Sequence, residues 1–218
     1  GGEFEIITEK SPDFIDLLRH DTAHVLAQAI KELYPKAQIV IGPNVENGFY
    51  YDVVLENGKT ISDEDFKSIE KEMDKIIRSN SPFVKSYKDI DEAIEWAKDN
   101  NQKFKSELLN DLKREGTTQF KDLDSAELGV ESGMNSKVEE VSFYTNNDFT
   151  DLCRGPHVES TAKAGHFKLI RVSGAYWRGN EKNAQMQRVY GVAFETKKEL
   201  DEYLHNLEEA KKRDHRKL

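Results

Sequence analysis

The sequence contains a single cysteine, Cys153, and no apolar stretch that approaches the roughly 20 residues needed to span a membrane. One cysteine excludes an internal disulfide framework, so we interpret its thiol as reduced and its compartment as intracellular. The N-terminus lacks the basic-then-apolar pattern of a secretion signal, and no internal repeat is evident. We therefore expect a cytoplasmic protein that has no membrane partner.

The composition suits one sizeable globular domain with appendages, since 37% of the 218 residues are hydrophobic and 33% are charged. The net charge of −9 is unfavourable for a nucleic-acid binder, but it is unevenly spread. Residues 1–152 carry 18 basic against 32 acidic side chains, residues 153–191 carry 7 against 2, and residues 211–218 carry 5 against 1. A polyanionic partner and an ordinary solvated surface both fit this pattern.

Hydrophobic spacing predicts the secondary structure. Apolar residues at three- and four-residue spacing predict helices over about 14–33, 62–77 and 90–100, and a charged helix follows from about 197. Runs rich in β-branched and aromatic residues predict strands at 39–41, 49–55, 166–172 and 187–194. Because the strands do not alternate with helices in βαβ units, we predict an α+β fold with helices packed on an antiparallel sheet. Residues 110–148 are acidic, show little periodicity and predict an insert or long loop.

Two equally spaced pairs of residues can carry chemistry. His20 and His24 stand four apart on the first predicted helix and share one face. Cys153 and His157 are also four apart, but Gly155 and Pro156 place them on a turn. Three imidazoles and one thiolate form a ligand set that Zn²⁺ accepts.

Each pair also has an ordinary alternative. Histidines at this spacing are common on amphipathic helices, and a lone cysteine is usually a small buried apolar residue. Because these pairs use three of the six histidines and the only cysteine, we predict a shared site and leave its metal content open.

Several segments closely resemble successive signatures of the threonyl-tRNA synthetases. They are residues 19–27 (RHDTAHVLA), 41–43 (IGP), 47–52 (NGFYYD), 151–158 (DLCRGPHV), 174–179 (GAYWRG), 187–191 (QRVYG) and 210–218 (AKKRDHRKL). The resemblance covers nearly the whole chain from about residue 14, except for 110–148.

The resemblance implies an organisation for the chain. In that family, a segment like 14–195 forms the editing region between a ubiquitin-like module and the aminoacylating domain. Residues 11–109 would be the first part of an editing domain. Residues 149–195 would be its second part, a smaller C-terminal β-containing subdomain, and 196–218 would be a linker helix towards an absent catalytic domain.

The resemblance also implies an activity, the hydrolysis of mischarged seryl-tRNA(Thr) while threonyl-tRNA(Thr) is spared. Serine lacks one methyl of threonine, a difference worth only about 1–3 kcal/mol in a binding pocket, so a second, hydrolytic site is needed. The implied partners are the acceptor end of tRNA(Thr) and the absent catalytic and anticodon-binding domains of the same polypeptide. No ligase activity is expected of this fragment.

The resemblance assigns roles to individual residues. His20 and His24 would position and activate water or the ribose hydroxyls, with Cys153 and His157 forming the facing wall. Lys105 would stabilise the oxyanion, although a solvated helix lysine is its ordinary alternative. The remaining expected contacts are Asp151 to the seryl ammonium, Tyr50, Tyr51 and Asp52 along the pocket, and Arg178, Arg188, Lys163 and Lys168 to the acceptor stem. Asp21 departs from the family pattern, because a small hydroxyl residue is expected there, and it could alter the charge near the histidines.

The resemblance bears on metal as well. Alanyl-tRNA synthetase editing domains share this constellation and bind Zn²⁺, whereas the threonyl versions are metal-free. We expect no required cofactor, with His20, His24, Cys153 and His157 as the ligands if zinc is present. The alternatives are a non-catalytic tRNA-binding module and a freestanding zinc-dependent aminoacyl-ester hydrolase.

Overall fold

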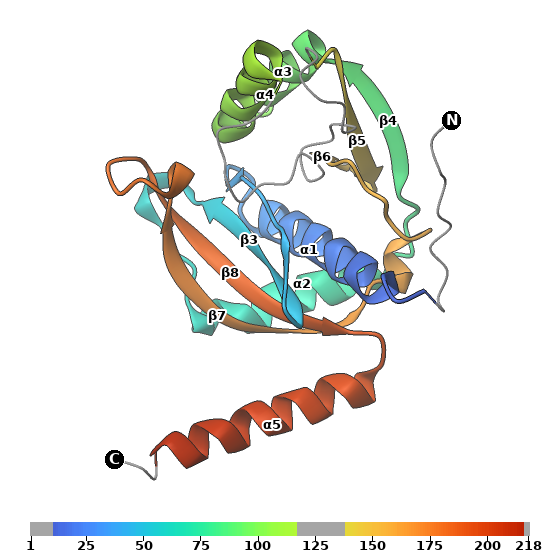
Figure 1. The fold of residues 1–218 in the computed structure, drawn as a ribbon, viewed down its shortest axis with the longest axis vertical. Helices are drawn as coiled ribbons and strands as arrows, with labels where there is room; N and C mark the ends of the chain where they lie inside the picture. The colour runs from blue at the N-terminus through green and yellow to red at the C-terminus, as the bar shows by residue number, and fades with distance from the viewer. Residues whose placement is uncertain (1–10, 117–137, 216–218) are drawn as a thin grey trace.

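The computed structural model describes residues 11–116 and 138–215 (Figure 1). The helices are α1 (Phe14–Leu33), α2 (Phe66–Arg78), α3 (Ile90–Asp99), α4 (Lys103–Glu115) and α5 (Lys197–His215). The strands are β1 (Gln38–Ile39), β2 (Asn44–Val45), β3 (Gly48–Val54), β4 (Val84–Asp89), β5 (Glu140–Asn146), β6 (Phe149–Leu152), β7 (His166–Tyr176) and β8 (Gln185–Phe194). None of the helices in these described ranges is long and apolar enough to cross a membrane.

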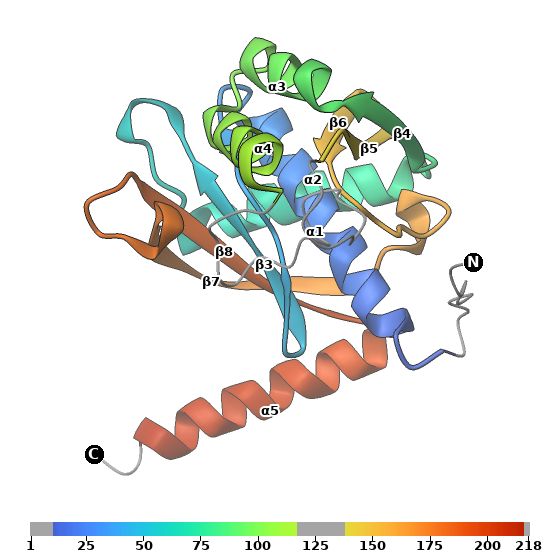
Figure 2. The same cartoon turned by 45° about the horizontal axis from the view of Figure 1, so that its top comes forward.

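The larger sheet has the order β1-β3-β8-β7, with β2 paired to β3, and its pairings are antiparallel. The helices α1 and α2 pack against this sheet (Figure 2). Their shared core is built from large side chains that water does not reach, including Leu26, Ile30, Phe49, Ile69 and Met73. The late strands β7 and β8 thus join an early strand in one sheet.

The smaller sheet has the antiparallel order β4-β5-β6. The helices α3 and α4 share a second hydrophobic core with it, in which Trp96 packs edge-on against Phe143 with ring centroids 4.8 Å apart. In Figure 1, α1 runs between this part of the molecule and the larger sheet. The helix α5 leaves the body of the fold after β8 (Figures 1 and 2).

The predicted α+β fold is confirmed, and local signals explain several element boundaries. Ser62 and Asp65 form a capping box before α2. The Asp89 carboxylate caps α3 by accepting the Asp91 backbone N–H at 2.8 Å.

The predicted loop at 110–148 differs from the structure at both ends. The helix α4 continues to Glu115 because Leu108, Leu109 and Leu112 are buried at helical spacing. At the other end, the range includes β5, whose residues are buried on both faces and therefore lack the polar alternation that marks a half-exposed strand. Residues 117–137 of the predicted acidic insert lie outside the described residues.

Candidate active site

His24 lies on the buried part of α1, and the half-buried His20 lies one turn before it. Every α1 residue from Asp21 to Ile30 is buried, because the helix is covered by the larger sheet on one side and by the β4-β5-β6 region on the other (Figure 1). The two histidines therefore face other parts of the protein, including the loop that follows β6.

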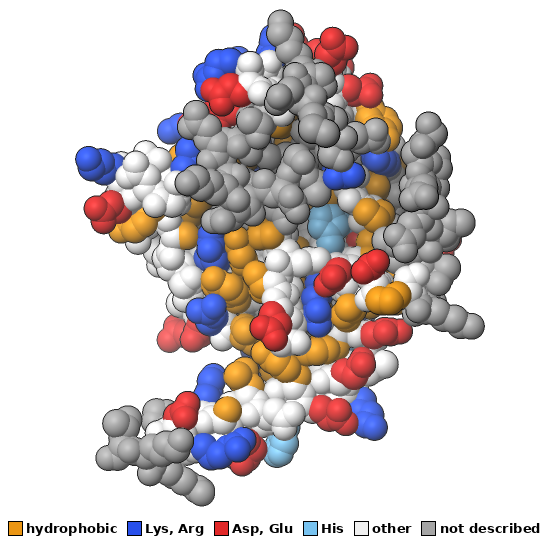
Figure 3. Space-filling model, viewed as in Figure 1, with side chains coloured by type: hydrophobic (Ala, Val, Ile, Leu, Met, Phe, Trp, Pro, Cys, Tyr) orange, Lys and Arg blue, Asp and Glu red, His pale blue; other side chains and the backbone are white. Residues whose placement is uncertain are grey.

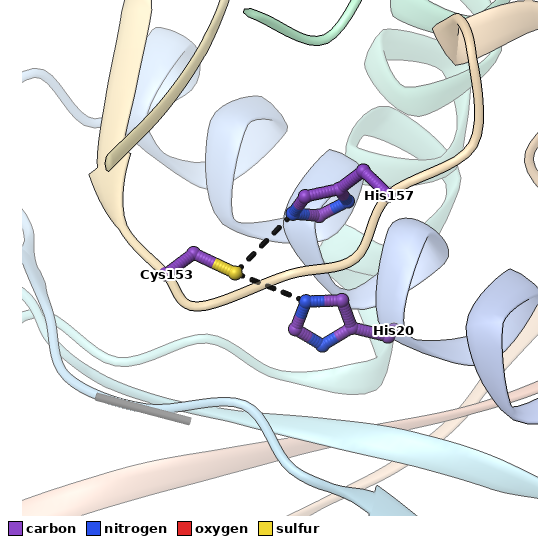
Figure 4. A group of neighbouring side chains, drawn as sticks. All are labelled: His20, Cys153 and His157. Atoms are coloured by element: carbon purple, nitrogen blue, oxygen red, sulfur yellow. Dashed lines mark hydrogen bonds between the residues drawn. The ribbon is translucent and has the colours of Figure 1, made fainter. Parts of the chain in front are cut away.

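That loop carries Cys153 and His157 and brings both to His20. Gly155 has a φ of 75°, and a Cβ there would lie 2.3 Å from the Tyr144 hydroxyl oxygen, so the turn requires glycine. The Cys153 Sγ lies 3.0 Å from His20 Nε2 and 3.3 Å from His157 Nε2 (Figure 4). The Gly155 backbone N–H donates to the same sulfur at 3.2 Å. The sulfur thus has three nitrogen neighbours from two segments far apart in sequence.

Asp21 joins this cluster from the opposite side of the His157 ring. Its Oδ1 lies 2.5 Å from His157 Nδ1, and its two oxygens accept the Val158 backbone N–H at 3.3 and 3.2 Å. Burial raises the pKa of Asp21 to about 7, and it lowers the pKa of His157 to about 3 and that of His20 to about 4. Both imidazoles are therefore neutral at neutral pH.

His24 does not join the thiol cluster, which corrects the predicted four-ligand set. Its Nε2 lies 2.7 Å from Asn146 Oδ1 on β5, and its ring meets the His157 ring edge-on with centroids 4.9 Å apart. The four-residue spacing from His20 predicted the face of α1 on which His24 lies. It could not predict which partner the His24 ring nitrogen contacts. Burial and the neighbouring His157 lower the His24 pKa well below its usual value.

Lys105 and Asp151 form a buried ion pair beside the histidines. The ammonium of Lys105 donates to Asp151 Oδ1, and each side chain belongs to a residue that is only 3% exposed. The Tyr51 hydroxyl donates to Asp151 Oδ2 at 2.7 Å, and the Leu152 N–H donates to Oδ1 at 2.8 Å. The solvated-lysine alternative for Lys105 is therefore wrong. Burial lowers the pKa of the Lys105 ammonium to about 7, and the nearby Cys153 thiol opposes that shift.

A cavity of about 30 Å³ lies where these groups meet. Its polar lining comes from His20, His24, Tyr51, Lys105, Asp151 and Cys153. Its apolar lining comes from Ala23, Val40, Ile41, Gly42 and Leu152. Six of the sequence-predicted site residues therefore line one cavity.

Tyr50 and Asp52 are not among the described residues that line the cavity, so their expected place along the pocket stays a prediction. Neighbouring residues of a strand point to opposite faces, and Tyr51 is the one that faces the cavity. Asp52 instead binds Arg188 through both oxygens at 2.8 and 3.0 Å, and the Arg188 guanidinium lies 4.1 Å from the Tyr50 ring centroid.

The four predicted acceptor-stem residues are each paired with a carboxylate of the same chain. Arg178 reaches Asp111 at 2.8 Å, Lys163 reaches Glu159 at 3.1 Å, and Lys168 reaches Glu70 at 2.8 Å. The fourth, Arg188, is held by Asp52 as described above. On the face in Figure 3, basic and acidic side chains are interspersed. These pairings weaken the case for a basic tRNA track at these positions.

Two buried amides complete the surroundings of His24, and sequence reasoning missed both. The Asn146 Oδ1 accepts from His24 Nε2, and the Asn146 Nδ2 donates to Gln28 Oε1. Gln28 had a readable signal, because it extends the four-residue spacing of His20 and His24 along one face of α1. Asn146 had none, because it belongs to a strand that the sequence did not reveal.

His20, Cys153 and His157 fit a zinc ion. Their ligand atoms all lie within 4.8 Å of one another, and a tetrahedral Zn²⁺ holds such atoms about 3.4–3.6 Å apart. Asp21 on His157 Nδ1 is the kind of outer partner that orients a metal-bound histidine. These three residues would hold the ion, and it would supply Lewis acidity and an open ligand position for water.

Comparisons with known proteins show what this chain is similar to. Residues 141–190 match the threonyl and alanyl tRNA synthetase second additional domain. The chain is 44% identical over 213 residues to the threonine–tRNA ligase of Bdellovibrio bacteriovorus and 47% identical over 214 residues to that of Clostridium novyi. Each alignment covers 98% of this chain, but it covers only 29% and 30%, respectively, of the two ligases. The chain therefore contains the second additional domain of threonyl- and alanyl-tRNA synthetases and corresponds along nearly its whole length to one region of the threonine–tRNA ligases.

Proposed function

We propose that this region hydrolyses the ester of seryl-tRNA(Thr) and spares threonyl-tRNA(Thr). One observation carries the proposal: two neutral histidines, a thiol and a buried ammonium–carboxylate pair line a single small cavity. Ester hydrolysis needs a proton acceptor for water, a donor to the developing oxyanion and an anchor for the seryl ammonium.

The histidines supply the proton acceptor. A histidine in the cavity takes a proton from water while the water oxygen bonds to the ester carbon. The bond from that carbon to the ribose oxygen then breaks, and the imidazolium returns the proton to the ribose oxygen. Because burial lowers the pKa values of His20 and His24, both rings have an unprotonated nitrogen at neutral pH.

Lys105 and Asp151 supply the donor and the anchor. The Asp151 carboxylate already accepts from the Lys105 ammonium, the Tyr51 hydroxyl and the Leu152 N–H, and it retains lone-pair capacity for a substrate ammonium. A second ammonium beside Asp151 would draw the carboxylate away from Lys105, which would leave the lysine free to donate to the oxyanion.

The packed apolar lining of the cavity supports discrimination by exclusion. Val40, Ile41 and Ala23 are packed against the cavity and are almost inaccessible to water. An added methyl therefore meets tightly packed apolar walls, where overpacking costs typically 1–3 kcal/mol.

We propose that the reaction requires no metal ion, because the groups in the cavity can perform each proton transfer by themselves. The second candidate is a zinc-dependent ester hydrolase, which the His20, Cys153 and His157 cluster favours. Metal content and sensitivity to a chelator distinguish the two.

The test uses a short seryl ester of adenosine, because this chain spans only 29% of the length of the Bdellovibrio bacteriovorus ligase that it matches. Exchanging His24 for alanine should lower the single-turnover rate by roughly 10²–10⁴-fold, the range for a general base. His166→Ala is the matched control, since His166 is exposed at the start of β7. Equal rates for His24→Ala and the parent protein would contradict the proposed chemistry.

A further inference from the structure

A line of hydrogen-bonded side chains runs from His24 away from the cavity to the surface. His24 Nε2 lies 2.7 Å from Asn146 Oδ1, Asn146 Nδ2 donates to Gln28 Oε1 at 2.5 Å, and Gln28 Nε2 donates to Glu32 Oε1 at 3.2 Å. His24, Asn146 and Gln28 are buried, with residue exposures of 4%, 1% and 1%. The Glu32 side chain is 40% exposed.

The Glu32 carboxylate at the outer end fixes the direction of donation along this row of hydrogen bonds. An ionised carboxylate only accepts hydrogen bonds, so Gln28 must turn its NH₂ group towards Glu32. Its carbonyl then faces Asn146 and requires the NH₂ group of that residue. The Asn146 carbonyl is left facing His24, so the His24 Nε2 must carry a hydrogen.

Burial makes this ordering strict. Two acceptors or two donors placed face to face would leave buried polar groups unsatisfied, and each such group costs about 1–3 kcal/mol. Reversal of any one amide would create such a mismatch at both of its neighbours. The state of a surface carboxylate therefore sets the tautomer of a histidine three hydrogen bonds away.

We propose that Glu32, Gln28 and Asn146 are positioning residues that hold His24 as its Nε2–H tautomer, so that Nδ1 is the nitrogen that accepts the proton of the attacking water. The part of this inference that concerns hydrolysis rests on the proposed function. The ring of His157 differs from that of His24, because its Nδ1 bonds the Asp21 carboxylate and its Nε2 bonds the Cys153 sulfur. Of these two rings, only His24 lines the cavity.

The test reverses the direction of these hydrogen bonds by a substitution at Glu32, the exposed end of the row. In Glu32→Lys, the new ammonium can only donate, so Gln28 and Asn146 should both turn over and present an NH₂ group to His24. His24 should then carry its hydrogen on Nδ1. The matched control is Glu72→Lys, which makes the same charge change on α2 beside Lys75 but leaves Glu32 a carboxylate.

Nitrogen-15 NMR of the imidazoles reads the tautomer directly and needs no activity. Burial and Glu72 raise the pKa of Glu32. The measurements are therefore made at pH 8, where the Glu32 carboxylate is ionised. We expect Nε2–H at His24 in the parent protein and in Glu72→Lys, and Nδ1–H in Glu32→Lys. An unchanged tautomer in Glu32→Lys, or Nδ1–H in the parent protein, would overturn the assigned direction.

Hydrolysis of the seryl-adenosine ester tests the role of Nδ1. We expect kcat to fall about 100-fold in Glu32→Lys with KM unchanged, and we expect Glu72→Lys to keep the parent rate. A switched tautomer with an unchanged kcat would overturn His24 Nδ1 as the acceptor. If the parent protein hydrolyses no ester but the tautomer still switches, the proposed function fails while the assigned direction stands.

Discussion

The buried pair of Lys105 and Asp151 gives the sharpest test of how the site is held together. We consider Lys105→Met and Asp151→Asn, which each remove one charge and change side-chain volume little, and the double variant that removes both. Each of the two residues is only 3% exposed, so either single change leaves an uncompensated group away from water.

The expected cost follows from that burial. Removing one partner of a buried ion pair destabilises by about 3–5 kcal/mol, whereas removing both together is often close to neutral. We therefore expect each single variant to lose about 3–5 kcal/mol of unfolding free energy and the double variant to lose several kcal/mol less than their sum. Tyr51→Phe removes only a neutral hydroxyl donor to Asp151, and it should cost about 1–2 kcal/mol.

Urea unfolding at constant pH measures these free energies, with equal m-values as the check that the denatured states are comparable. Additive losses in the double variant, or single losses below about 1 kcal/mol, would refute a tightly coupled pair. Either result would also weaken the roles proposed for Lys105 and Asp151 in holding the ester.

Three further outcomes are expected. The histidines of the site have lowered pKa values and the adjacent Asp21 a raised one, so between about pH 5.5 and 4 the unfolded chain binds about two more protons than the folded one. Stability in urea should thus fall by roughly 3 kcal/mol per unit as pH drops through this window, and a flat profile would contradict the neutral buried rings. Protein purified without added zinc should contain well under one equivalent and keep its deacylation rate in a chelator; stoichiometric zinc that Cys153→Ser abolishes would favour the zinc hydrolase instead. Replacing Arg188 with glutamine should lower stability by about 3 kcal/mol, because Asp52 stays buried without its partner, and should leave seryl-adenosine hydrolysis nearly unchanged; loss of that hydrolysis would show that Arg188 shapes the cavity.

Much of the helical framework could be predicted, because its signals are local. Apolar spacing and caps such as Ser62 and Asp89 predict the first three helices. The strands β4 to β6 could not be predicted in the same way. The edge strand β4 is mostly exposed, and β5 is buried on both faces, so neither shows the alternation that identifies a strand.

The part of the site that could be predicted also depends on local spacing. Equal spacing correctly brought His20, Cys153 and His157 together, since helix and turn geometry decide which way these side chains point. Spacing could not reveal that Asn146, from a distant strand, takes the His24 nitrogen. Strand alternation separates Tyr50 from Tyr51, which is the one of the two that lines the cavity.

The central claim is tested most directly by deacylation of the same tRNA(Thr) carrying either serine or threonine, measured under single-turnover conditions with this protein in excess. We predict rapid loss of the seryl ester and a threonyl ester that survives nearly as long as in buffer. Equal hydrolysis of the two esters, or hydrolysis of neither, would contradict selective editing at this cavity.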